Sequence, residues 1–246
     1  MSSAPARPQR VQLLATCLID ALRPDVGWAV VRLLERLGVE VSLPAGQTCC
    51  GQPALNAGSR GDARAMARHT LELLSRSPDP VLVPSGSCAD MLRHRYPELF
   101  EGEERERARQ LAARTWELSE LLTGPLGGGP PGARCEARVA YHPSCHLLRG
   151  LGVEGGPERL IDGVAGARRV AVEGSQDCCG FGGLFSIKHP EISAAMLRRK
   201  LDALEASGAD RVVACDLSCL VHIEGGLRRR GSPLVVQHLA ELLEER

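Results

Sequence analysis

QDCCGFGG at residues 176–183 and QTCCGQP at residues 47–53 each place two adjacent cysteines directly before a glycine. Further cysteines stand at matching distances from both stretches. Eight of the ten cysteines fall on the resulting pattern, four in each half of the chain: Cys17, Cys49, Cys50 and Cys88, then Cys145, Cys178, Cys179 and Cys219. The offsets between equivalent cysteines are 128, 129 and 131 residues. So small a drift indicates two homologous halves that differ by short loop changes.

The segments between these cysteines alternate between strand and helix patterns. Short apolar runs bounded by turn residues predict strands at 11–15, 39–43, 80–84, 138–141, 169–172, 210–214 and 233–236. Apolar spacing of helical period predicts helices at 26–37, 62–75, 103–122, 157–164, 190–207 and 238–243, with one more beginning near Cys88. This alternation predicts an α/β fold of two homologous lobes related by a pseudo-two-fold duplication, each lobe a parallel sheet flanked by helices.

The glycine- and proline-rich stretch GPLGGGPPG at 124–132 is the clearest linker in the chain. We therefore expect a first cysteine-rich domain at 10–123, a linker at 124–134 and a second cysteine-rich domain at 135–246. The eight patterned cysteines all follow predicted strands, and ligands of parallel sheets collect outside the carboxyl ends of the strands. A sulfur-lined pocket is expected in each lobe.

Composition limits the possible partners and the compartment. The formal net charge is zero, which argues against nucleic acid as the main partner. No apolar run approaches the ~20 residues needed to cross a bilayer, and the first ten residues lack the apolar core of a signal peptide. We expect a cytoplasmic protein, in which clustered cysteines serve as metal ligands or redox groups more often than as structural disulfides.

Adjacent cysteines favour an iron–sulfur cluster over zinc. They are hard to direct onto one tetrahedral ion, but they can reach two irons of a polynuclear cluster. The glycine that follows would let the backbone approach a bulky cluster. A zinc-binding structural protein remains the alternative from spacing alone. Cys135 has no counterpart and is expected to be a small buried apolar residue; Cys215 is a bystander or a spare ligand.

At this point the chain resembles the cysteine-rich CCG domain, and most closely the LutA/YkgE family of lactate-utilisation iron–sulfur proteins. The segments that carry the resemblance include LLERLGVEV (33–41), QTCCGQPA (47–54), PSGSC (84–88), YHPSCHLLRGLGV (141–153), CCGFGG (178–183) and RRGSPLVVQHLAELL (229–243). Related domains occur in heterodisulfide reductase and in the iron–sulfur subunit of glycolate oxidase. The resemblance covers nearly the whole chain.

The resemblance implies iron–sulfur clusters, one 4Fe–4S per domain, held by the eight patterned cysteines. This sequence departs from the full motif, which ends in Cys–x–x–Cys, because Ser85 and Asp216 replace the first of those cysteines. Four cysteines per half suit one 4Fe–4S cluster. Alternatively, Ser85 and Asp216 supply oxygen ligands or leave an iron open to a substrate. His142 and His146 flank Cys145, and loop hydrogen bonding is expected of them more than direct ligation.

The resemblance also implies a function. The expected role is an electron-transfer subunit of an oxidoreductase complex that converts L-lactate to pyruvate, with a LutB-like ferredoxin-type iron–sulfur subunit and a LutC-like subunit as partners. A small 2-hydroxy acid would be the substrate of the complex, and the sequence leaves open whether chemistry occurs on this chain. The alternative is an iron–sulfur enzyme of heterodisulfide-reductase or glycolate-oxidase type that acts directly on a disulfide or a 2-hydroxy acid.

Overall fold

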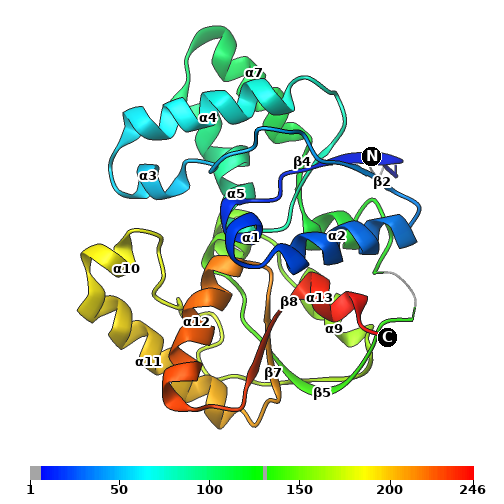
Figure 1. Ribbon diagram of the computed structural model, residues 1–246, viewed down its shortest axis with the longest axis vertical. Helices are drawn as coiled ribbons and strands as arrows, with labels where there is room; N and C mark the ends of the chain where they lie inside the picture. The colour runs from blue at the N-terminus through cyan, green and yellow to red at the C-terminus, as the bar shows by residue number, and fades with distance from the viewer. Residues whose placement is uncertain (1–6, 130–131) are drawn as a thin grey trace.

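The computed structural model describes residues 7–129 and 132–246. It contains two four-stranded parallel sheets, one from each half of the chain (Figure 1). The strand orders are β2-β1-β3-β4 and β6-β5-β7-β8, so the second sheet repeats the topology of the first. The predicted α/β fold with two homologous lobes is confirmed. The predicted linker includes residues 130–131, which lie outside the described residues.

The first lobe is built from β1 (Arg10–Leu13), α1 (Cys17–Leu22), α2 (Pro24–Arg36), β2 (Glu40–Ser42), α3 (Gln52–Asn56), α4 (Arg60–Leu74), β3 (Val81–Val83), α5 (Gly86–Asp90), the π-helical turn η1 (Met91–Arg95), α6 (Tyr96–Leu99), α7 (Gly102–Ala113), β4 (Thr115–Glu117) and α8 (Leu118–Thr123). The second lobe is built from β5 (Arg134–Tyr141), the π-helical turn η2 (His146–Gly150), α9 (Gly156–Asp162), β6 (Ala165–Val170), α10 (Phe185–Lys188), α11 (Pro190–Ala206), β7 (Arg211–Ala214), α12 (Leu217–Arg230), β8 (Val235–His238) and α13 (Leu239–Glu244).

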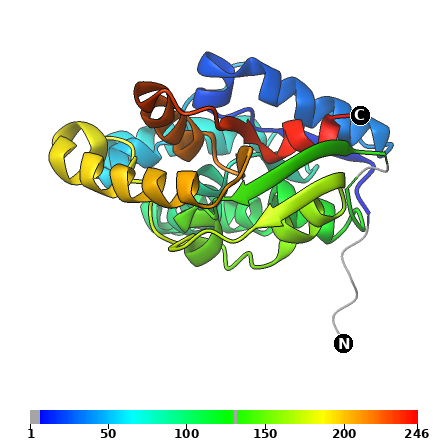
Figure 2. The same ribbon diagram turned by 90° about the horizontal axis from the view of Figure 1, so that it is seen from below.

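Alternation along the strands gives each sheet two buried faces. Val11 and Leu13 of β1 face a core that both lobes share, while Leu14 joins a separate core of the first lobe. In β5, Val139 faces the shared core and Ala140 faces the core of the second lobe. Figure 2 shows β5 and β6 side by side, in the parallel register that pairs Val139 with Arg169.

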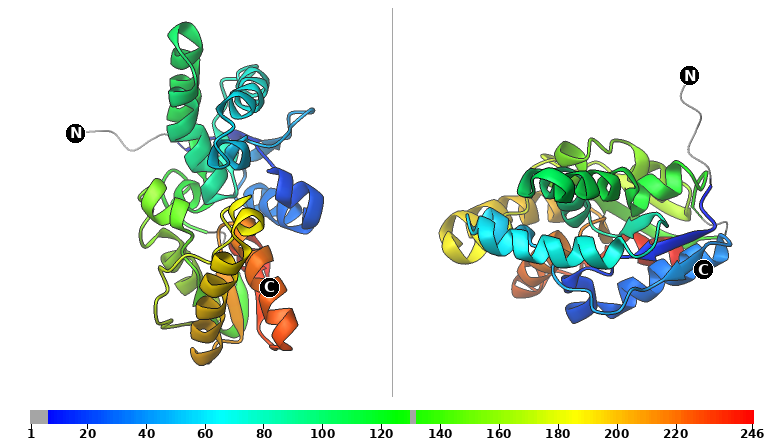
Figure 3. Two further views of the ribbon diagram at one scale, coloured as in Figure 1. Left: turned by 90° about the vertical axis from the view of Figure 1, so that its left-hand side faces the viewer. Right: turned by 90° about the horizontal axis from the view of Figure 1, so that it is seen from above.

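The shared core joins the lobes through four helices, α2 and α8 from the first lobe with α9 and α13 from the second. Ion pairs reinforce this packing: Arg32 meets Glu244 at 2.7 Å and Arg23 meets Glu241 at 3.0 Å, both between α2 or its N-cap and α13. The outer faces carry α4 and α7 on one lobe and α11 and α12 on the other (Figures 1 and 3). The lobes therefore have a common apolar layer.

One predicted helix is wrong in its extent. Residues 103–122 form two helices, α7 and α8, separated by the edge strand β4. Thr115 is buried and Glu117 caps α8 through Ser119, so the helical pattern restarts rather than continues. The predicted strand at 169–172 is observed earlier, as β6, because it pairs with the long strand β5 from Arg134 onward.

Within the described ranges, no helix combines the length and the apolar character that crossing a membrane requires.

Candidate metal centre

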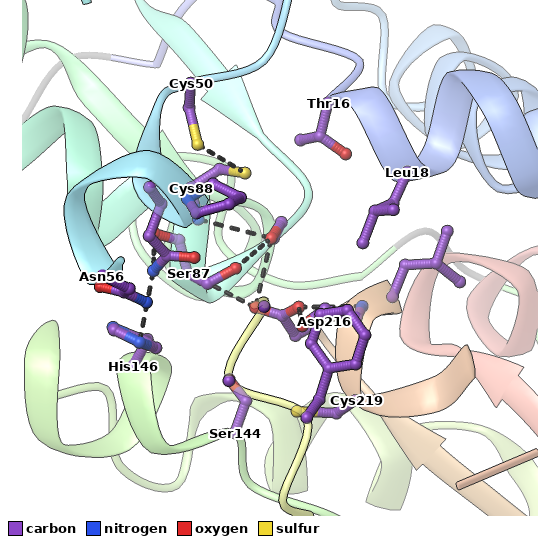
Figure 4. A pocket seen from close by; sticks show the side chains of 18 of the residues that line it. Thr16, Leu18, Cys50, Asn56, Ser87, Cys88, Ser144, His146, Asp216 and Cys219 are labelled. Carbon is purple, nitrogen blue, oxygen red and sulfur yellow. Dashed lines mark hydrogen bonds between the residues drawn. The ribbon is translucent and has the colours of Figure 1, made fainter. Parts of the chain in front are cut away.

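All eight patterned cysteines line one cavity of about 300 Å3 between the lobes. Figure 4 shows Cys50 and Cys88 of the first lobe and Cys219 of the second beside it. Its walls come from the segments that follow β1, β2 and β3 in the first lobe and β5, β6 and β7 in the second. The three thiol-bearing loops of each lobe converge, as the topology predicts. The expected two separate pockets are one shared pocket instead, because the carboxyl ends of the two sheets face each other across it.

The sulfur atoms within each set lie close together as free thiols. In the first lobe, the Sγ atoms of Cys50 and Cys88 are 3.4 Å apart. Hydrogen bonding between Cys17 and Cys49 lowers the pKa of Cys49 well below its usual value and raises that of Cys17.

In the second lobe, hydrogen bonding between Cys145 and Cys178 likewise lowers the pKa of Cys178 and raises that of Cys145. Metal binding requires thiolates, so each set already favours one ligand in its binding form.

The backbone of each Cys–Cys–Gly segment turns back on its first sulfur. The N–H groups of Gly51 and Gly180 donate to Cys49 Sγ at 3.5 Å and to Cys178 Sγ at 3.4 Å. Hydrogen bonds of this kind tune the potential of an iron–sulfur cluster. The two lobes thus share the same arrangement of cysteines and the same backbone hydrogen bond to the first sulfur atom of the pair.

The structure gives a further reason why glycine is needed at these two positions. Gly51 has φ +88° and Gly180 has φ +91°, in the left-handed region that favours glycine. A Cβ atom would lie 3.0 Å from the carbonyl oxygen of Ala63 in α4 and 2.7 Å from that of Ser193 in α11. The close approach is therefore to a helix behind the loop.

Ser85 and Asp216, at the positions where the full motif has cysteines, are helix N-caps that bond to each other. Ser85 caps α5 and accepts from the N–H of Cys88; Asp216 caps α12 and accepts from the N–H of Ser218. Asp216 accepts four hydrogen bonds: Oδ1 from the N–H and hydroxyl of Ser218, and Oδ2 from Ser85 Oγ and Ser87 N–H. Its carboxylate is fully engaged, which disfavours a role as an oxygen ligand.

His142, which flanks Cys145 in the sequence, does not make the loop hydrogen bonds expected of it. It follows β5 directly, is 1% exposed, and neither ring nitrogen has a hydrogen-bond partner among the described residues. One of its ring nitrogens and the sulfur atoms of Cys179 and Cys219 lie within 4.8 Å of one another. Burial lowers the pKa of His142 to about 4, so the imidazole is neutral at pH 7. In the sequence, His142 can be recognised as a histidine at the end of a predicted strand, but cysteine spacing does not distinguish it from His146.

His146 lies on the same cavity but has partners for both nitrogens. Its Nδ1 is 2.8 Å from Oδ2 of Asp90, and its Nε2 is 3.3 Å from the side-chain nitrogen of Gln52. The hydrogen bond with Asp90 raises the pKa of His146. Asp90 and Gln52 belong to the first lobe, so the hydrogen bonds of His146 connect the two lobes beside the cavity. The expectation that His146 would form hydrogen bonds is confirmed.

The two leftover cysteines lie off the cavity. Cys135 is buried in β5, where burial raises its pKa. Cys215 is fully buried in the shared core, and burial raises its pKa as well. Neither lines the cavity, so the structure places them as packed apolar residues.

This donor set fits an iron–sulfur group. Four thiols per lobe converge from three loops, and backbone N–H groups point at the sulfur atoms of Cys49 and Cys178. Cys88 and Cys219 stand in the first turns of helices α5 and α12. The clustered cysteines therefore form a site suited to a metal or an iron–sulfur cluster.

Comparison with known proteins gives the same picture. The family model described as the CCG cysteine-rich domain matches residues 11–93 and 139–224. Lactate utilization protein A of an Exiguobacterium species is 43% identical over 238 residues, which cover 96% of this chain and 97% of that protein. The protein of the same name from a Geobacillus species is 42% identical over 239 residues, which cover 96% of this chain and 100% of that protein.

Among solved structures, a hypothetical protein from Helicobacter pylori superposes with a TM-score of 0.61 at 11% sequence identity. The match covers 99% of this chain, which spans 50% of that protein's length. At this identity the likeness concerns the fold alone. The sequence matches, in contrast, extend over both lobes and include both cysteine sets, so the chain belongs to the family of CCG cysteine-rich proteins named lactate utilization protein A.

Proposed function

We propose that this protein is an iron–sulfur electron-transfer subunit of a cytoplasmic oxidoreductase complex that oxidises L-lactate to pyruvate. The observation that carries the proposal is the placement of eight free cysteines, in two equivalent sets, on one cavity. The names of its relatives supply lactate as the substrate of the complex. The partners would be a LutB-like ferredoxin-type iron–sulfur subunit and a LutC-like subunit.

The number of sites matches the chemistry of the substrate. Oxidation of L-lactate to pyruvate releases two electrons and two protons, and two 4Fe–4S clusters would accept one electron each. Cys17, Cys49, Cys50 and Cys88 would hold one cluster, and Cys145, Cys178, Cys179 and Cys219 the other. Since both sets line one cavity, the two centres would lie close enough together to exchange electrons within the chain.

A second candidate function is direct action of this chain on a small disulfide or 2-hydroxy acid. The shared cavity favours it, because Phe181, Leu184 and Ile187 give the cavity an apolar wall beside the two cysteine sets. If Ser85 and Asp216 leave iron open to substrate, Ser85→Cys and Asp216→Cys should each abolish lactate-dependent reduction. Unchanged reduction in both variants would exclude that form of the model.

The test of the main proposal is anaerobic iron and sulfide analysis with electron paramagnetic resonance, on the chain alone and then with its partners. About eight irons per chain are expected, in two four-iron clusters that lactate reduces only when the partner subunits are present. A colourless protein that contains zinc and no iron would overturn the proposal. Reduction of the isolated chain by lactate would instead favour the second candidate.

A further inference from the structure

The two lobes differ at one position beside the sulfur atoms. Leu14 and His142 are equivalent: each follows the first strand of its sheet, and each donates its backbone N–H to the neighbouring strand, Leu14 to Leu82 at 2.9 Å and His142 to Val213 at 2.8 Å. Leu14 packs in the core of the first lobe with Cys50 and Cys88. His142 lies at the same place beside Cys179 and Cys219. Only the second lobe therefore presents an imidazole to its thiols at this position.

No hydrogen bond of ordinary length and angle holds the imidazole among the described residues, although the backbone of Ser175 lies near enough to raise its pKa against the effect of burial. A buried polar group without a partner costs roughly 1–3 kcal/mol, so an orphaned histidine needs an explanation. His142 is 1% exposed, and both ring nitrogens lack hydrogen-bond partners among the described residues. The buried amine of Lys200 does not supply one, because it donates to the carbonyl oxygens of Gly174 and Ser175 at 2.8 and 2.9 Å. The unused nitrogen lies instead against two sulfur atoms.

We propose that His142 is a metal ligand of the second lobe, acting with Cys179 and Cys219. It then takes one of the four ligand positions assigned above to cysteines, in place of Cys145 or Cys178, so that this lobe binds iron through nitrogen and sulfur and the first lobe through sulfur alone. The proposal rests on the function proposed above. Imidazole is a common ligand of iron, and histidine in place of cysteine raises the reduction potential of an iron–sulfur centre. The two centres are then inequivalent, and electrons collect in the second lobe.

The test uses the reconstituted full chain, with natural and with ¹⁵N-labelled histidine, and measures nitrogen coupling to the reduced clusters by pulsed electron paramagnetic resonance. Wild type should show coupling on one of its two centres. His142→Leu, which copies the first lobe, and His142→Cys should lose it. His146→Gln is the matched control, since both nitrogens of His146 already have partners, and it should keep the coupling.

A redox titration of the same samples gives a second readout. Wild type should be reduced in two steps at different potentials. His142→Cys should lower only the higher of the two potentials, so that the two steps lie closer together. Iron in both lobes with no nitrogen coupling, or coupling that survives in His142→Cys, overturns this inference and leaves the proposed function intact. A chain that binds no iron overturns both.

Discussion

The hydroxyl group of Ser85 donates a hydrogen bond of 3.2 Å to Oδ2 of Asp216, across the boundary between the lobes. The two residues hold equivalent places, each as the N-cap of the helix that carries the last cysteine of its lobe, Cys88 or Cys219. The bond therefore fixes the two cysteine sets relative to each other. At these two positions, serine and aspartate in place of cysteine remove a thiol ligand and provide a hydrogen bond between the lobes.

Loss of the Asp216 carboxylate should destabilise the protein strongly. Asp216→Ala leaves the N–H groups of Ser87 and Ser218 without their acceptor in a buried site, and we expect a loss of about 2–4 kcal/mol in the free energy of unfolding. Ser85→Ala removes one bond to Asp216 and one weak cap, and should cost about 1 kcal/mol. Denaturant unfolding of the metal-free chain measures both, and equal small losses would contradict the assigned network.

The glycines of the two Cys–Cys–Gly segments should tolerate alanine unequally. Gly180→Ala forces a Cβ to 2.7 Å from a backbone oxygen, whereas in Gly51→Ala the distance is 3.0 Å. Left-handed backbone costs alanine roughly 1–2 kcal/mol, and the overlap adds about 1–3 kcal/mol, more at Gly180. Gly58→Ala is the control, because Gly58 has φ +86° and open space around it. The loss in the free energy of unfolding should be largest for Gly180→Ala, smaller for Gly51→Ala and smallest for Gly58→Ala. Equal losses would show that α4 and α11 shift to accommodate the added Cβ.

Serine substitutions should separate the patterned cysteines from the other two. Cys50→Ser and Cys179→Ser each remove one buried thiol from one set, and each should lower the iron content of the reconstituted chain by about half. Cys135→Ser and Cys215→Ser should leave iron content unchanged, since neither side chain lines the cavity. Iron analysis after anaerobic reconstitution decides this, and iron loss in Cys215→Ser would restore that residue as a ligand.

The sequence predicted those features that repeat or alternate. Apolar runs located the strands that are buried on both faces, and cysteine spacing located the loops at their ends, because both signals are local. Strand β4 was missed because Thr115–Glu117 lies between two helices whose apolar residues continue at helical spacing. Its counterpart β8 was found because Pro233 separates it from the preceding helix.

Features that depend on how the lobes pack were beyond local patterns. Spacing could not show that both cysteine sets share one cavity, since that follows from the common layer of α2, α8, α9 and α13. Spacing also could not show that a helix lies behind each Cys–Cys–Gly glycine, because α4 and α11 are brought there by the fold. The sequence placed His142 beside Cys145, but only the structure shows that its ring nitrogens lack hydrogen-bond partners among the described residues and that it lies near Cys179 and Cys219.

Glu117 should make stability depend on pH. It is fully buried at the N-cap of α8, where Oε2 accepts from the N–H and hydroxyl of Ser119 and Oε1 has no partner among the described residues. Burial raises its pKa to about 8. Because the folded pKa lies above the unfolded value of roughly 4.3, the protonated form stabilises the fold. That contribution is complete below the unfolded pKa and is lost as pH rises through about 8.

Glu117→Gln removes this titration and keeps a capping oxygen. Relative to wild type, its free energy of unfolding should rise by roughly 2–4 kcal/mol between pH 5 and pH 9. His238, the equivalent cap of α13, gives the opposite sign: burial lowers its pKa, so its contribution is present above pH ~6.5 and is lost as pH falls. The free energy of unfolding of His238→Gln should therefore rise relative to that of wild type only at acid pH. Parallel pH profiles for wild type and Glu117→Gln would mean that the buried carboxyl finds compensation elsewhere in the shared core.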